Sequence, residues 1–550
     1  MKIPPGPKPA ENYPAETASR PPRKYTDLAI SLLLLALVLA ESSISLRKIG
    51  ISWDEPGYFR AAKEYTAWAR HLNRDSFSGP VLEETFGFIP TINDHPTLGK
   101  LLGALTYVAF RKFMPGFFAY RMSAVFIFAA LLIAVYLRAA RQSGRLAGFA
   151  SIMALATIPP VFVHCHIAAT DAPLCLFWFL SAWAYARACE RPGLSWLAGL
   201  CYGLCMSVKF TGFFLPVPLL AYGLLYHRRR MLYPSLALLL GPAVFFMLQP
   251  ELWHAPLAGI SRFLEMSLTR HDWNRIWTDF LGKTYDFSPP WYYAPFMTLV
   301  TIPELTVIFS LTGIVRAGLN RFRNRLAGES ALHFLFFMLI TMLPQTPVFD
   351  GIRLFLPAMV FLAILSGTAM AEFCEWLARI LTTSPSAWLA GRKALVKYSV
   401  AGLLSAALLS CLMSIYPYGM EYYNRLIGGV KGARARGMET TYWGTVMNED
   451  TIKELNQLLP KNAVIRFDRI SSGVPLLYQE MGWLRSDLRL TKGTDFDYVL
   501  ILSRPYWNSP RIFSRLGVPV SELVPVKALV VDEVPFYILY RRKAQAAAQE

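Results

Sequence analysis

Charged residues are scarce in this chain, and long stretches of it carry none. Only 17% of the 550 residues are Asp, Glu, Lys or Arg, whereas 54% are hydrophobic and the mean hydropathy is +0.34. A soluble globular protein has roughly 25% charged residues. The apolar residues form blocks of about 15–22, close to the ~20 that span a bilayer core. The composition predicts an all-α polytopic membrane protein, and these uninterrupted blocks exclude the alternating pattern of a β-barrel.

Cysteine is also sparse, and the chain has no internal repeat. The seven cysteines contain no C-x-x-C pair and lie in or beside apolar blocks, so no disulfide framework is expected. The net charge of +18 does not form a basic groove with interleaved aromatic residues, which argues against nucleic-acid binding. Basic residues accumulate in the cytoplasmic loops of membrane proteins, and this rule explains the charge more simply.

The loop charges predict an orientation. Lys and Arg precede the first apolar block (27–46), so the N-terminus is expected inside, as an uncleaved anchor with a disordered cytoplasmic segment, 1–26. The short block 98–110 is expected at the membrane interface, because counting it as a crossing breaks the charge alternation. About eleven transmembrane helices then follow, with outer-face loops 47–118 and 249–290.

The composition changes near residue 416. We expect a membrane domain over 27–416 and a small extracytoplasmic α/β domain over 417–550. Its predicted elements are a helix at 452–459 and short strands at 463–467, 498–502, 528–531 and 536–540.

Asp54 and Glu55 open an amphipathic segment with Tyr58, Ala62 and Tyr65 at helical spacing. This helix is expected in the membrane interface. One carboxylate can be a helix N-cap and the other a general base, because adjacent residues cannot both point at one atom. The pattern alone leaves these two roles open.

Four basic residues are expected at the same outer face: His95, Arg121, Lys209 and Arg353. A single such cation is ordinary, since Lys and Arg at span ends reach up to lipid headgroups. Several around one carboxylate pair indicate an anionic ligand such as a lipid phosphate.

Two further features have competing interpretations. His164-x-His166 with Asp171 could bind a metal, but residues i and i+2 do not share a helix face, so a structural or substrate-contact role for Asp171 is favoured. Glu304 is a functional candidate if it lies within the bilayer, and an interfacial residue if Pro303 marks the border of a short span.

The ordered set of these motifs resembles the glycosyltransferase C superfamily, in particular the protein O-mannosyltransferases and the bacterial aminoarabinose lipid A transferases. The motifs that carry the resemblance are Asp54-Glu55, Asp94-His95-Pro96-Thr97-Leu98, Arg121, Thr170-Asp171-Ala172-Pro173-Leu174, Ser207-Val208-Lys209-Phe210-Thr211-Gly212, Pro289-Pro290-Trp291-Tyr292-Tyr293, Gly351-Ile352-Arg353-Leu354-Phe355-Leu356-Pro357, Tyr422-Tyr423-Asn424 with Gly428-Gly429, and Tyr442-Trp443-Gly444.

The resemblance implies an inverting transfer of a sugar from a polyprenyl-phosphate donor to an acceptor hydroxyl, with no metal or other cofactor. Asp54 takes the position of the base, supported by Glu55 and Asp171. His95 takes the position of a cation near the donor phosphate, with Arg121, Lys209 and Arg353 as companions. The expected acceptor is a protein, a glycan or a lipid. The expected location is the bacterial inner membrane, with the active site and the C-terminal domain periplasmic.

The chain departs from the family in two places. Thr97 stands where a second proline is usual, and His95 stands where the lipid A branch has lysine. Neutral imidazole binds phosphate more weakly than lysine, which weakens the case for aminoarabinose specificity. Two other function classes compete: a flippase or transporter of lipid-linked sugars, whose charges usually lie near the bilayer midplane, and an inactive scaffold.

Overall fold

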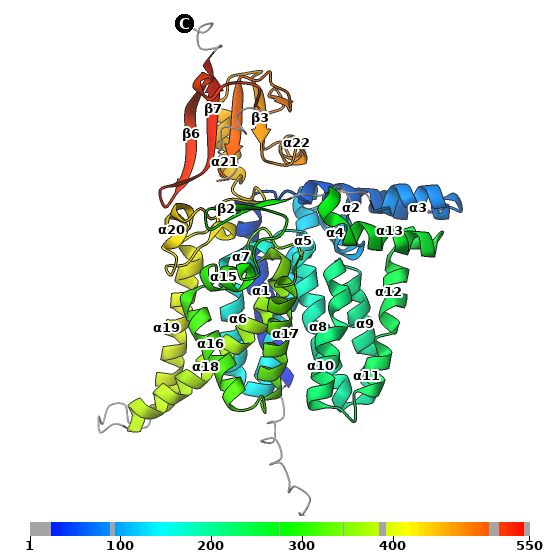
Figure 1. The fold of residues 1–550 in the computed structure, drawn as a ribbon, viewed down its shortest axis with the longest axis vertical. Coiled ribbons are helices and arrows are strands. Elements are labelled where there is room, and N and C mark those ends of the chain that lie inside the picture. The colour runs from blue at the N-terminus through cyan, green and yellow to red at the C-terminus, as the bar shows by residue number, and fades with distance from the viewer. Residues whose placement is uncertain are drawn as a thin grey trace, which may run out of the picture.

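The computed structural model describes residues 24–88, 94–273, 276–344, 346–383, 392–504 and 516–543. Upright helices form a bundle, and a small sheet domain stands above one end of it (Figure 1). The predicted architecture, a helical membrane protein with a small C-terminal α/β domain, is confirmed. Residues 1–23, which carry most of the predicted disordered segment, lie outside the described residues.

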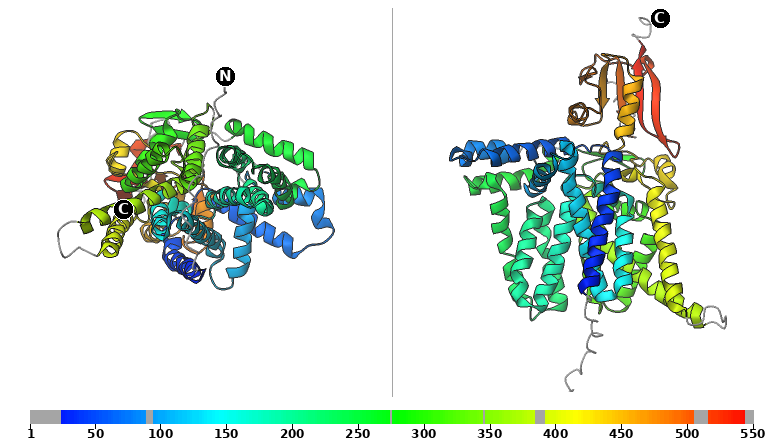
Figure 2. Two further views of the ribbon diagram at one scale, coloured as in Figure 1. Left: turned by 90° about the horizontal axis from the view of Figure 1, so that it is seen from below. Right: turned by 180° about the vertical axis from the view of Figure 1, so that it is seen from behind.

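Four described helices are long and apolar enough to cross a membrane: α1 (Lys24–Lys48), α5 (Gly116–Ser143), α18 (Leu356–Thr383) and α19 (Lys393–Met413). The apolar window of α18 is 83% buried, whereas those of α1 and α19 are 17% buried. A helix that is apolar all round belongs in a core or against lipid. Therefore α18 is the central helix, and α1 and α19 are peripheral (Figure 2).

Shorter helices complete the bundle, so the prediction of about eleven crossings stays a prediction. They are α4 (Leu98–Phe110), α6 (Arg145–Ala156), α7 (Pro159–His164), α8 (Asp171–Glu190), α9 (Ser195–Met206), α10 (Pro216–Tyr226), α11 (Leu232–Ala237), α12 (Leu240–Leu248), α15 (Tyr293–Val300), α16 (Glu304–Leu319) and α17 (Arg325–Thr341).

Close backbone approach holds the centre of the bundle together. Helix α18 packs against α6, α16 and α17. A Cβ atom on Gly367 of α18 would lie 2.2 Å from the backbone nitrogen of Ser151 in α6. Small residues at such crossings let two membrane helices pack at short distance.

Three helices lie across the upper end of the bundle and extend to one side of the sheet domain (Figure 1). They are α2 (Glu55–Arg70), α3 (Gly79–Phe86) and α13 (Pro256–Leu268). Helix α2 buries Tyr58, Ala62 and Tyr65, the face that the sequence predicted. The remaining short helices are α14 (Arg270–Trp273), α20 (Gly429–Ala435), α21 (Glu449–Leu458) and α22 (Gly473–Glu480).

The upper domain contains a five-stranded mixed sheet in the order β4-β3-β5-β7-β6. Its strands are β3 (Val464–Asp468), β4 (Arg489–Thr491), β5 (Tyr498–Leu502), β6 (Leu523–Val531) and β7 (Val534–Arg542). Strand β3 runs parallel to β4 and β5, and β7 runs antiparallel to β5 and β6. All five residues of β5 are buried, as expected for a central strand covered on both faces. A separate hairpin, β1 (Trp277–Phe280) with β2 (Lys283–Asp286), lies below this domain.

Candidate active site

A cavity of about 1150 Å³ lies between the upper ends of the membrane helices and the sheet domain. Its floor comes from segments that precede or follow helices: Asp54 before α2, His95 before α4, Lys209 after α9 and Arg353 before α18. Its roof comes from the loop between β3 and α22. Residues far apart in sequence therefore meet at one end of the bundle.

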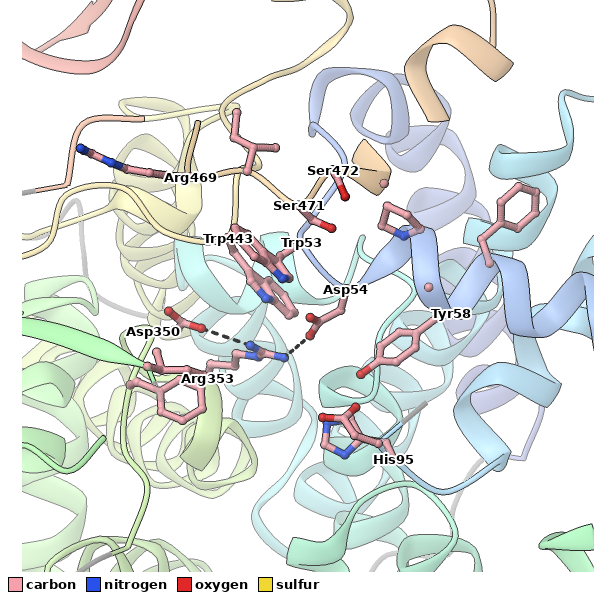
Figure 3. A pocket seen from close by; sticks show the side chains of 18 of the residues that line it. Trp53, Asp54, Tyr58, His95, Asp350, Arg353, Trp443, Arg469, Ser471 and Ser472 are labelled. Atoms are coloured by element: carbon pink, nitrogen blue, oxygen red, sulfur yellow. Dashed lines mark hydrogen bonds and ion pairs between the residues drawn. The ribbon is translucent and has the colours of Figure 1, made fainter. Parts of the chain in front are cut away.

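Arg353 is the centre of the site (Figure 3). Its guanidinium reaches three carboxylates, at 2.5 Å from Asp54, 3.2 Å from Asp171 and 3.1 Å from Asp350. The guanidinium carbon lies 3.7 Å from the ring centroid of Trp443, which is close enough for a cation–π contact. These four partners hold the arginine side chain in one place.

Asp171 lies behind the cavity wall and not on it. Its side chain is 1% exposed, and it also accepts a hydrogen bond of 2.7 Å from the Lys209 ammonium. It therefore orients two cations, Lys209 and Arg353, whose own side chains line the cavity. This geometry is that of a positioning carboxylate.

Asp54 is the most exposed of the three carboxylates that contact Arg353, and it lines the cavity. Its side chain is 24% exposed, against 1% for Asp171 and 7% for Asp350. It occupies the N-cap position of α2 but accepts no capping hydrogen bond, so its oxygens are turned toward Arg353 and the cavity. Burial raises the pKa of Asp54, and the charge of Arg353 opposes that rise. A carboxylate of raised pKa at the wall of a cavity can accept a proton from a bound hydroxyl.

His95 lines the floor as predicted, but not as a cation. Burial lowers its pKa to about 3, so the imidazole is neutral at neutral pH. The Lys100 ammonium donates to the His95 carbonyl at 2.6 Å, and the neighbouring Asp94 pairs with Arg270 at 2.7 Å. A neutral imidazole donates one N–H to a phosphate oxygen, so the assignment of His95 to the donor phosphate stays a prediction.

Glu55 and Arg121 do not line the cavity, so their predicted roles at the site do not involve direct contact with a ligand bound there. They form a bidentate ion pair, with contacts of 2.6 and 2.7 Å, in which the side chains are 0% and 1% exposed. Arg121 also donates to the carbonyls of Leu46, Ile49 and Gly50. Their role is to fix the start of α2 against α5.

The two histidines of the candidate metal motif diverge. His166 contacts Glu41 at 2.8 Å, whereas His164 lies 3.9 Å from Asp171. Among the described residues, no three His, Cys, Asp or Glu side chains are grouped as metal ligands. Glu304 begins α16 and accepts a hydrogen bond from the Arg425 backbone, so it links two segments of the outer end.

Sequence reasoning missed several residues of the cavity. Asp350 and Arg270 were not assigned to the site, although Asp350 stands three residues before Arg353 and that spacing was a usable signal. Trp443 belongs to the motif Tyr442-Trp443-Gly444 of the family resemblance, but nothing in the spacing of that motif indicates that Trp443 packs on Arg353. The roof residues of the sheet domain carried no recognisable pattern.

Comparison with known proteins supports one family. Residues 94–254 match the family model of dolichyl-phosphate-mannose-protein mannosyltransferases. The fold is similar to that of ArnT from Cupriavidus metallidurans, whose crystal structures were determined bound to undecaprenyl phosphate and in the apo state. The TM-scores are 0.51 and 0.50, each at 14% identity, over 93% and 94% of this chain and 98% of each ArnT chain. No curated protein sequence matches the chain.

The matched segment and the similarity of the fold indicate a glycosyltransferase, and the chain has helices long and apolar enough to span a membrane. Residues 94–254 carry the likeness to that family, and over the rest of the chain the likeness is one of fold alone.

Proposed function

We propose that this enzyme transfers a sugar from a polyprenyl-phosphate donor to an acceptor hydroxyl, with inversion, and that Asp54 is the general base. The observation that carries this proposal is the exposure of Asp54 to a cavity whose floor also holds Lys209 and Arg353. The family description and the lipid bound to ArnT support the donor class.

The proposed reaction uses groups on the cavity floor. Lys209, Arg353 and the neutral His95 bind the donor phosphate, and Asp171 holds the two cations in place. The acceptor oxygen attacks the anomeric carbon from the face opposite the phosphate. The bond from that carbon to the phosphate oxygen breaks, the phosphate leaves with the electron pair, and Asp54 takes the hydroxyl proton. Positioning and charge neutralisation supply most of the rate, because phosphate is already a good leaving group.

The proposed location is the periplasmic side of a bacterial inner membrane. Three arginines, Arg228 to Arg230, lie in the α10–α11 connection at the end of the bundle opposite the sheet domain (Figure 1). Basic connections are typical of the cytoplasmic side. In this orientation the membrane domain (27–416) presents its outer loops and the domain 417–550 to the periplasm.

Transfer can be tested in membranes supplied with a panel of labelled polyprenyl-phosphate sugars. We expect wild type to move label to a new product, and Asp54→Asn to do so about 10²–10⁴-fold more slowly, since it lacks the base. Glu64→Gln is the matched control, because Glu64 is exposed on the same helix and pairs with Arg60.

Two results contradict the proposal. Transfer by Asp54→Asn at the rate of the Glu64→Gln control removes Asp54 as the base. Label that only changes leaflet, with no new product in either protein, replaces the transferase with a flippase of lipid-linked sugars.

A further inference from the structure

A series of ion pairs connects the sheet domain to the proposed base. The Nη2 atom of Arg504, in the segment after β5, lies 3.7 Å from Oδ1 of Asp350. The other oxygen of Asp350, Oδ2, accepts a hydrogen bond of 3.1 Å from Nη1 of Arg353. The Nη2 atom of the same guanidinium lies 2.5 Å from Asp54 (Figure 3). One carboxylate, that of Asp350, is therefore shared between an arginine of the sheet domain and the arginine that contacts the proposed base.

The backbone holds Asp350 between the two arginines. Asp350 has φ 55° and Gly351 has φ 68°, both in the left-handed region that residues other than glycine seldom adopt. The Gly351 nitrogen donates to the hydroxyl of Tyr293 at 3.2 Å, and a Cβ atom on Gly351 would collide with the hydroxyl of Tyr442. Conformations of this kind persist only where the surrounding structure determines them, and they cluster at functional sites. The turn therefore keeps the Asp350 carboxylate within reach of both arginines.

Arg504 is held in place by its own domain. Its Nε donates to the carbonyl of Thr441 at 3.2 Å, and the Thr441 hydroxyl donates to the carbonyl of Ser503 at 2.7 Å. The side chains of Arg504 and Asp350 are only 15% and 7% exposed. Salt screens partly buried charges much less than charges at the surface. The Arg504 charge therefore acts on Asp350 in a fixed geometry and with little screening.

The remaining groups that face Asp350 are uncharged in acid solution. They are Tyr293, Tyr442 and Glu439. Tyrosine hydroxyls have an ordinary pKa of about 10, and burial raises the pKa of Glu439 from 4.5 to about 8. Asp54 in turn faces Asp94 and Asp171 in addition to Arg353. Among the described groups that face Asp350, Arg353 and Arg504 are thus the two that carry charge below about pH 8.

We infer that Arg504 is a positioning residue for the reaction: it holds the Asp350 carboxylate and thereby sets how strongly Arg353 interacts with Asp54. This inference rests on the proposed function. When Arg504 is present, Asp350 divides its negative charge between two arginines, and more of the Arg353 charge is left for Asp54. Without Arg504, Asp350 interacts more strongly with Arg353. Asp54 then binds a proton more tightly, and a smaller fraction of it is ionised at a given pH.

The test is the pH profile of transfer in the membrane assay, measured as kcat/KM, which reports ionisation of the free enzyme. In Arg504→Gln we expect the acid limb to move up by about half a pH unit, a fraction of the ~1–3 units that a cation in direct contact produces. Arg504→Lys keeps the charge and should keep the wild-type acid limb. Arg489→Gln is the matched control, because Arg489 is exposed on β4 and lies outside the cavity. An acid limb that does not move in Arg504→Gln overturns the inference.

A double variant separates an effect through Asp350 from a direct effect of the Arg504 charge on Asp54. In Asp350→Asn the shared carboxylate is gone, so the further change Arg504→Gln should move the acid limb much less than it does in the wild-type background. Equal shifts in the two backgrounds overturn the inference, since the two substitutions then act independently. If Arg504→Gln does not fold, Arg504→Met removes the same charge, retains an apolar stem and replaces it in both comparisons.

The outcomes also separate this inference from the proposed function. Absence of transfer by wild type contradicts the proposed function itself. An acid limb that persists unchanged in the residual activity of Asp54→Asn assigns the limb to another group and removes Asp54 as the base. Transfer whose acid limb depends on Asp54 but not on Arg504 leaves the proposed function intact and overturns the inference alone.

Discussion

One arginine ties the carboxylates of the site together. Arg353 divides its charge among Asp54, Asp171 and Asp350, and Trp443 packs on its face. The proton affinity of Asp54 therefore depends on how strongly Arg353 interacts with Asp54 compared with Asp171 and Asp350. In the proposed reaction, a donor phosphate bound to Arg353 weakens the interaction of Arg353 with Asp54, which makes Asp54 a stronger base when a donor is present.

The pH profile should report this division of charge. Because burial raises the pKa of Asp54, the acid limb of kcat/KM should lie above the ordinary Asp range, with activity lost as the pH falls through that pKa. In Asp350→Asn, more of the Arg353 charge falls on Asp54 and one nearby negative charge is removed. Both changes lower the pKa of Asp54, so the acid limb should move to lower pH and the plateau rate should fall about tenfold.

Asp450→Asn is the control for this profile, because Asp450 pairs with Lys48 outside the cavity. An acid limb that stays in place in Asp350→Asn would show that Asp350 does not act on Asp54 through Arg353.

The pattern of residues predicted Asp54, Lys209 and Arg353 at one site but left the roles of Asp54 and Glu55 open, and only the family resemblance assigned the base to Asp54. Both are carboxylates at one helix start, and the direction of each depends on Arg121, which lies 66 residues beyond Glu55. A pattern within one segment does not contain that contact. The neutral state of His95 is likewise a consequence of burial by other segments.

At the level of elements, the start of α2 is anchored by a buried ion pair. Glu55 accepts hydrogen bonds from the backbone nitrogens of Ser52 and Ala168 as well as from Arg121. Asp54 is the preceding residue, so the same contacts fix the position of the proposed base.

Removing one partner of this pair should destabilise the enzyme strongly. Arg121→Met leaves the Glu55 carboxylate buried without its counter-ion, at a cost of about 3–5 kcal/mol. Replacing both, as in Glu55→Gln with Arg121→Met, should recover part of that loss because no buried charge remains. The measurement is the fraction of protein that stays monodisperse after heating in detergent. If both variants match wild type, the pair does not anchor α2.

Element boundaries were predicted well where hydrophobic pattern alone decides them. The bounds of α4 and β5 coincide with the predicted 98–110 and 498–502. Strands β6 and β7 extend beyond their apolar cores because they pair with each other as a hairpin. Helix α22, strand β4 and the β1–β2 hairpin were missed, since they are short and stabilised by contacts with distant segments.

At the level of the whole molecule, a buried acid lies beneath the sheet domain. Glu439 is 4% exposed, its Oε1 has no hydrogen-bond partner among the described residues, and burial raises its pKa from the usual 4.5 to about 8. Its backbone nitrogen donates to Asp279 of β1. The Glu439 carboxyl is therefore protonated in the folded protein at neutral pH.

The resulting pH dependence of stability has a definite sign. The folded protein holds the Glu439 proton up to about pH 8 and the unfolded chain loses it near 4.5, so stability falls as the pH rises between these values, by about 1.4 kcal/mol per unit. Glu439→Gln resembles the protonated acid. It should match wild type in thermal inactivation at pH 5 and outlast it at pH 9. The same difference at both pH values would rule out titration of Glu439.

Backbone hydrogen bonds join the segment between α1 and α2 to the segment between α20 and α21. The nitrogens of Gly50 and Trp53 donate to the carbonyls of Thr445 and Trp443, each at 2.9 Å. The segment before Asp54 thus acquires these partners only after nearly four hundred further residues have been synthesised, a stretch that includes α19. A nascent chain that ends before residue 443 contains Asp54, the proposed base, but lacks Trp443, the ring on which Arg353 packs. The proposed site is therefore complete only after residues 443–445 have been synthesised and have paired with the segment before α2.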